Sequence, residues 1–137
     1  MVRKFFVVLL IFCSFCLPVL AENQPSLSTL VSVQNVPFEQ CTKIFKINNE
    51  NLFFLTIASI NANRFSITEI QSKKGYILFN AVGREFLANV VKIDSSNSIL
   101  RITPVNNIYY FQPGIVLNIF RYIELNSALT PVNLTIK

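Results

Sequence analysis

The positions of apolar and polar residues divide this chain into helical stretches and a run of short strands. Residues 65–103 hold four short apolar or alternating segments, separated by turn residues at positions 72–75, 81–83 and 94–98. Alternation between turn signals is typical of strands that follow one another in an antiparallel meander. We therefore predict a sheet over this stretch, against which the rest of the chain packs.

The predicted strands carry further detail. Residues 65–71 alternate, but Ile70 is out of phase with the apolar positions before it, which predicts a β-bulge. Gly75 ends a tight hairpin connection where a positive φ is needed. Residues 76–80 are almost continuously apolar, so we expect that strand to be central and covered on both faces, or to lie at an interface. Residues 84–93 form the longest strand and are apolar on both faces.

Apolar spacing of about 3.6 residues predicts two helices, over residues 49–63 and 115–125. Asn48 or Asn49 can cap the first of them. Residues 38–47 fit a helix or a strand, and we favour a helix because a proline and an acid stand at its start. The aromatic stretch 106–111 is predicted to form a short fifth strand.

These elements predict an α+β fold: a helix, a four- to five-stranded antiparallel meander and a C-terminal helix packed on one face of the sheet. The length of 137 residues suits one domain, which we place at residues 37–126. Residues 22–36 are polar and are predicted to be a flexible tether that pairs with an edge near positions 30–33. Residues 127–137 are expected to form a loose tail or a short edge strand.

Residues 1–21 have the parts of a secretory signal: a basic start, an apolar run over residues 5–17 and a small-residue site that ends at Ala21. We predict cleavage there and export to the periplasm or the medium. An uncleaved anchor, the only expected membrane contact, is disfavoured because the apolar run is shorter than the roughly 20 residues of a bilayer span. Neither Cys13 nor Cys16 follows a small residue, which argues against lipidation.

Composition excludes several classes of function. Apolar residues make up 52% and charged residues 14% of the chain, so it should fold rather than stay disordered. The net charge of +5 comes from scattered basic residues, which argues against a nucleic-acid surface. The chain has no histidine and its acids fall singly, so we predict no enzyme, no metal site and no cofactor.

Two groups of residues remain as candidates for chemistry. Cys41 is the last cysteine and has no histidine partner, so we expect a buried, unreactive side chain. Aromatic residues could line an apolar groove between the sheet and the last helix, although filling the core is the favoured interpretation. The candidate groove residues are Phe79, Phe86, Tyr109, Tyr110, Phe111 and Ile119.

A family resemblance rests on a helix that ends before Arg64-Phe65-Ser66-Ile67 and on the hairpin Ser72-Lys73-Lys74-Gly75-Tyr76-Ile77. Over residues 37–124, the order of helix, antiparallel meander and helix resembles the small envelope domains of the helix-grip type. Among these it is similar to component C of the bacterial outer-membrane β-barrel assembly machinery. The resemblance implies an envelope domain; this chain lacks the lipid-attachment motif of that family, and no functional residue can be carried over.

The function predicted from the sequence is that of an exported, non-enzymatic accessory domain that binds another envelope protein. The alternative is a carrier for a lipid or another apolar ligand, held between the sheet and the C-terminal helix. A filled core with an exposed apolar patch would favour protein binding, and an apolar cavity of a few hundred cubic ångströms would favour the carrier. The sequence leaves the partner and the oligomeric state open.

Overall fold

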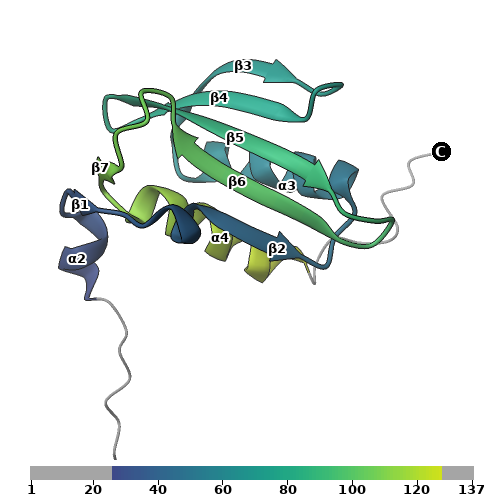
Figure 1. Ribbon diagram of the computed structural model, residues 1–137, viewed down its shortest axis with the longest axis horizontal. Coiled ribbons are helices and arrows are strands. Elements are labelled where there is room, and N and C mark those ends of the chain that lie inside the picture. The colour runs from purple at the N-terminus through teal and green to yellow at the C-terminus, as the bar shows by residue number, and fades with distance from the viewer. Residues whose placement is uncertain (1–25, 128–137) are drawn as a thin grey trace, which may run out of the picture.

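Five antiparallel strands form the main sheet, in the order β2-β6-β5-β4-β3 (Figure 1). The computed structural model describes residues 26–127. Four of the strands follow one another along the chain and pair with their neighbours. They are β3 (Ser66–Gln71), β4 (Tyr76–Ala81), β5 (Arg84–Lys92) and β6 (Ser98–Pro104). The predicted α+β class and the predicted meander are confirmed.

Turn chemistry set by the sequence holds this meander in register. Gly75 has a φ of 73° and its N–H donates to the carbonyl of Gln71 at 2.8 Å, as the predicted hairpin requires. The β5–β6 loop is held by the Asp94 carboxylate, which accepts hydrogen bonds from the Asn97 side chain and, at 2.8 Å, from the Ser96 N–H. These hydrogen bonds stabilise the charged form and lower the pKa of Asp94.

The predicted bulge in β3 is also confirmed. The pairing of β3 with β4 shifts register between Ile67 and Glu69. After this shift Ile70 pairs with Ile77, whose side chain is buried, so the bulge returns Ile70 to the inner face of the sheet. Ile70 itself stays partly exposed because β3 is an edge strand.

The helix predicted for residues 38–47 is wrong. A short 3₁₀ turn, Phe38–Cys41, leads directly into β2 (Thr42–Phe45), which pairs with β6 and completes the sheet. Successive side chains of β2 face opposite sides of the sheet: Phe45 is buried on the inner face, while Ile44 lies on the outer face. Because β6 lies 59 residues further along the chain in this pairing, for example Thr42 with Arg101, local periodicity could not reveal it.

The fifth strand predicted from residues 106–111 is also wrong for the main sheet. Only Tyr110–Phe111 (β7) is extended, and it pairs with β1 (Gln34–Asn35) in a separate two-stranded sheet. The expected tether, as far as it is described, contains this strand and the short helix α2 (Leu27–Val31). Pairing therefore occurs just after the predicted positions 30–33.

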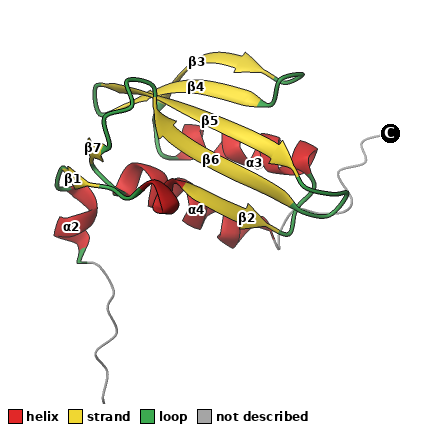
Figure 2. Ribbon diagram, in the orientation of Figure 1, coloured by secondary structure: helices red, strands yellow, loops and turns green. Residues whose placement is uncertain are grey.

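Two helices of 14 residues cover one face of the sheet (Figure 2). The first is α3 (Asn49–Ala62), whose first turn is capped by the Asn48 side chain at 2.8 Å from the Asn51 N–H. The second is α4 (Gly114–Ser127). They contact each other through the buried Ser59 hydroxyl, which donates to the Ile119 carbonyl at 3.2 Å. Both helix predictions are confirmed.

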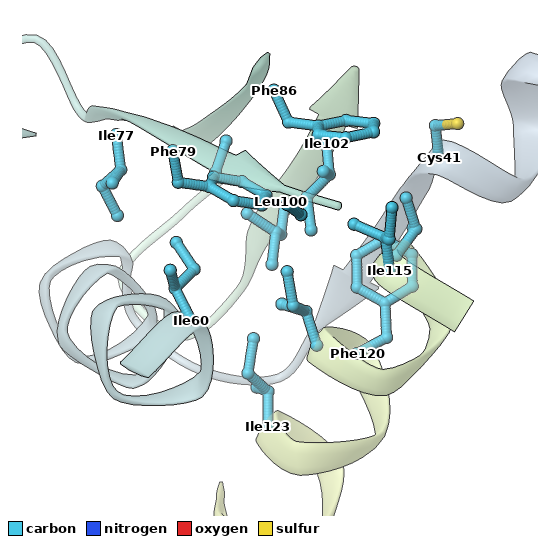
Figure 3. Packing of buried hydrophobic residues seen from close by; sticks show 14 of the residues in the cluster. Cys41, Ile60, Ile77, Phe79, Phe86, Leu100, Ile102, Ile115, Phe120 and Ile123 are labelled. Atoms are coloured by element: carbon cyan, nitrogen blue, oxygen red, sulfur yellow. The ribbon is translucent and has the colours of Figure 1, made fainter. Parts of the chain in front are cut away.

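The hydrophobic core lies between this helical layer and the inner face of the sheet, as Figure 3 shows for Ile60, Phe79 and Ile123. The strand β4 was expected to be central and covered on both faces, or to lie at an interface. The centre is instead β5, and β4 buries Ile77 and Phe79 but leaves Asn80 on the other face exposed. Because α3 and α4 both lie on the inner face of the sheet, neither covers the other face of β4. The predicted signal peptide and most of the predicted tail lie outside the described residues.

Candidate functional site

Most of the predicted groove residues belong to the core. Phe79, Phe86, Phe111 and Ile119 are at most 1% exposed. The Phe86 ring stacks on Phe79 with centroids 5.6 Å apart and meets Phe111 edge-on at 5.1 Å. Tyr109 is partly buried against this core, whereas Tyr110 is exposed on β7. The inner aromatic residues therefore fill the space in which a ligand between sheet and α4 would have to lie.

The thiol of Cys41 is buried where the 3₁₀ turn meets β2. Its Sγ donates to the Pro37 carbonyl at 3.8 Å. Burial, and next the negative charge of Glu39, raise the pKa of Cys41 to about 11. The side chain thus stays a thiol at neutral pH, as expected of a buried residue, and is a poor nucleophile.

The acidic residues do not converge on a site. Glu69 and Glu85 share the outer face of the sheet but are separated by β4, so they do not form a carboxylate pair. Glu69 accepts a hydrogen bond from Gln71 at 3.1 Å, and together with desolvation its carboxylate raises the pKa of Tyr76. Among residues 26–127, no three metal-binding side chains gather in one place.

The outer face of the sheet, opposite α3 and α4, carries exposed apolar side chains. Strand register places Ile44, Ile99 and Val91 in one row across β2, β6 and β5. Leu87 and Leu78 face each other on the same side of β5 and β4. Ile44 is 62% exposed and Val91 is 40% exposed, while the other three are partly buried. We call these five residues the open-face patch.

A polar row crosses the open-face patch between its two apolar groups. The row contains Arg101, whose guanidinium lies 5.6 Å from the centre of the Phe38 ring and 3.4 Å from the Thr42 hydroxyl. Phe38 in turn meets the Tyr109 ring edge-on at 5.9 Å. These contacts hold a positive charge beside the apolar row, at the end where the chain enters β2. The face therefore offers apolar contact with a fixed cation at one side.

A hollow of about 400 Å³ lies elsewhere, between the first turn of α3 and the β3–β4 hairpin. Phe53 and Phe54 supply its apolar wall and Glu50, Asn49 and Ser72 its polar wall. It is separate from the predicted groove beside α4.

Comparison with known proteins assigns no family model to the chain and finds no curated protein of similar sequence. No helix within residues 26–127 is long and apolar enough to cross a membrane.

The sequence signal for the open-face patch was present in β5, where Leu87 and Val91 alternate with core residues. The contribution of Ile44 was missed because its segment was interpreted as a helix.

Proposed function

We propose that this protein is an exported, non-enzymatic accessory domain of the cell envelope, which binds another protein through the open-face patch. One observation carries the proposal: the outer face of the sheet presents Ile44 and Val91 to solvent on either side of Ile99. Clustered apolar side chains on the surface mark interaction sites more often than scattered ones do. Complete burial of such a side chain contributes about 1.5–3 kcal/mol.

The filled core supports protein binding over the carrier alternative. A carrier would hold its ligand between the sheet and α4, but the rings of Phe86 and Phe111 meet edge-on and belong, with Ile119 of α4, to the buried core. The outer face of the sheet, by contrast, exposes the apolar side chains of Ile44 and Val91. Sheet faces of this kind bind a partner by covering apolar residues, with the rim staying polar.

A matched pair of variants tests the binding surface. In the double variant Ile44→Asp/Val91→Asp, two charges replace exposed apolar side chains of the patch, with little effect on the core. The control Ile108→Asp changes an apolar residue in the β6–β7 loop whose exposure, 56%, lies between that of Val91 and that of Ile44. Each protein is purified from the envelope of its host after chemical cross-linking, and the bound species are identified by native mass spectrometry.

We expect the wild type and Ile108→Asp to retain the same protein partner. The double variant should bind that partner with an affinity about tenfold lower or weaker still; a tenfold loss corresponds to about 1.4 kcal/mol. Equal retention by the double variant would place binding elsewhere. A lipid that co-purifies with all three proteins, without a protein partner, would instead favour the carrier.

Export is tested separately by the mass of the protein recovered from its host. Cleavage after Ala21 predicts a mature chain that begins at Glu22. Recovery of the uncleaved chain in the membrane fraction would contradict cleavage. It would indicate instead that residues 1–21 anchor the protein to the membrane.

A further inference from the structure

Exposed apolar side chains gather at the end of the molecule where the sheet meets α2, β1 and β7 (Figure 1). They come from four segments of the chain: α2, the β4–β5 turn, the β6–β7 loop and β7. Each of these side chains is between 48% and 81% exposed. We call the group the apolar end, and its members are Leu27, Val31, Val82, Val105, Ile108 and Tyr110.

Tertiary contacts join these segments into one surface. The Arg84 side chain, at the start of β5, donates to the carbonyl oxygen of Ile108 at 3.0 Å and to that of Tyr110. Strand β7 pairs with β1, which follows α2 in the chain. The helix α2 is seated closely on the first residue of α4, because a Cβ atom at Gly114 would lie 2.6 Å from the Leu30 carbonyl oxygen. The apolar end is therefore held in place by contacts between distant segments.

The β4–β5 turn carries a valine where the backbone disfavours one. Val82 and Gly83 form this two-residue turn, and both have a positive φ, of 51° and 74°. Positive φ at both positions is the pattern of a type I′ turn, for which Asn-Gly is a preferred pair. A β-branched residue with positive φ is strained, and such strain is found mostly at functional sites. Because Val82 is 61% exposed, burial in the core does not offset its strain.

Positive charge lies beside these apolar side chains. Within residues 26–127, no carboxylate forms an ion pair with Arg84. Arg64 is exposed near the same end, since it stands two residues before Ser66, which pairs with Asn80 next to the β4–β5 turn. Against these two basic residues stands one acid, Glu85, which is exposed on β5. The excess of positive charge suits the negative surface of a membrane that contains anionic lipid.

The chain enters the domain at the apolar end. Ser26 stands directly before α2 and caps its start. Residues 1–21, with their apolar run, precede it in the sequence, and the stretch from Ala21 to Ser26 can span at most about 18 Å. While the predicted leader is in a membrane, as export requires, the apolar end is therefore held close to the bilayer.

We propose that the apolar end binds the surface of an anionic lipid bilayer, a contact that the sequence did not predict. Binding of this kind combines the burial of apolar side chains with attraction between basic residues and anionic lipid. Tyr110 suits the site, because tyrosine is enriched at the membrane–water interface. The contact needs no uncleaved leader. The open-face patch contains none of these residues, so the inference is independent of the proposed function.

Tryptophan fluorescence tests the contact at single positions, because the chain has no tryptophan of its own. Ile108→Trp puts a reporter at the apolar end. The matched control Ile44→Trp puts it on the open-face patch, at a native exposure of 62% against 56% for Ile108. Both full-length proteins are titrated with vesicles of equal parts phosphatidylglycerol and phosphatidylethanolamine. The emission of Ile108→Trp should shift to shorter wavelengths, and that of Ile44→Trp should stay unchanged.

A substitution in the turn separates membrane binding from stability. Val82→Asn places an Asn-Gly pair in a turn that favours it, so it should raise the melting temperature. The same change removes an apolar side chain from the apolar end. In the Ile108→Trp protein it should therefore raise the lipid concentration at half of the emission shift by about fivefold or more. The control Val91→Asn, made in the same protein, removes an exposed valine from the open-face patch and should leave that concentration unchanged.

Several results would overturn the proposal. The first is no shift for Ile108→Trp, which is also the result expected if the leader alone holds the protein on the vesicles. Others are an equal shift for Ile44→Trp, or an equal effect of Val82→Asn and Val91→Asn. A shift that appears without vesicles, as a dimer forms in light scattering, would mean that a second copy covers the apolar end. Circular dichroism checks that every variant is folded, and none of these results depends on whether the open-face patch retains a protein partner.

Discussion

The two faces of the sheet differ although the same strands build both. In β5, Phe86 and Ala88 are fully buried beneath the helical layer, whereas Leu87, which stands between them in the chain, lies on the outer face together with Val91. Apolar residues occur on both faces, but α3 and α4 cover only one. The covered face holds the fold together, and the outer face leaves apolar surface available for a partner. Stability and binding should therefore respond to different residues, even to adjacent ones.

The largest expected difference is between alanine variants of two adjacent residues that lie on opposite faces of the sheet. Phe86→Ala removes a ring that contacts both Phe79 and Phe111 and should lower the free energy of unfolding by about 3–5 kcal/mol. Leu87→Ala, on the partly exposed face, should cost no more than about 1.5 kcal/mol. Urea unfolding followed by circular dichroism measures both. Similar losses for the two variants would mean that the outer face is also covered in solution.

A second prediction concerns the hairpin that decides which β4 side chains face inward, since a one-residue slip would exchange the two faces. Gly75 has a φ of 73°, and a Cβ atom there would stand 2.8 Å from the carbonyl oxygen of Val90. Gly83 has a φ of 74° but nothing within 4 Å of the same position. Both Gly→Val variants suffer the backbone strain of about 1–3 kcal/mol, and Gly75→Val should cost more because of the clash.

Thermal unfolding of the two glycine variants, measured side by side, separates strain from the clash. An equal loss at both positions would show that the β5 backbone at Val90 moves aside without cost. An unchanged melting temperature for Gly75→Val would show that the turn lies elsewhere.

The smallest predicted effect concerns two buried serines on the covered side. Ser59 donates to the Ile119 carbonyl, so Ser59→Ala should lower the free energy of unfolding by about 1 kcal/mol. The Ser98 hydroxyl is buried and has no hydrogen-bond partner among the described residues, so Ser98→Ala should be neutral or stabilising. Chemical denaturation in parallel checks the sign. A loss for Ser98→Ala as large as that for Ser59→Ala would reveal a hydrogen bond to water.

Prediction from the sequence succeeded where the signal was local. The cap at Asn48, the positive φ at Gly75 and the bulge before Ile70 each depend on a few consecutive residues. It failed for residues 38–47, because the apolar positions in this short segment fit the spacing of a helix as well as the alternation of a strand. It favoured core filling over a groove for the candidate groove residues, which is correct for Phe79, Phe86, Phe111 and Ile119 but not for the exposed Tyr110, because burial depends on what packs above a side chain and not on its type alone.

The sequence by itself determined the two long helices, the four-stranded meander with its turns, and the apolar character of both faces of β5. Periodicity and turn residues encode these features because they arise from contacts within a few residues. Only the tertiary structure decided that β2 adds to the far side of β6, that β7 pairs with β1 instead, and which face the helices cover. Those outcomes depend on contacts between segments far apart in the chain, whose hydrogen-bonding edges are alike in every strand. The open-face patch is one of them, because Ile44 joins Ile99 and Val91 only when β2 takes its place in the sheet.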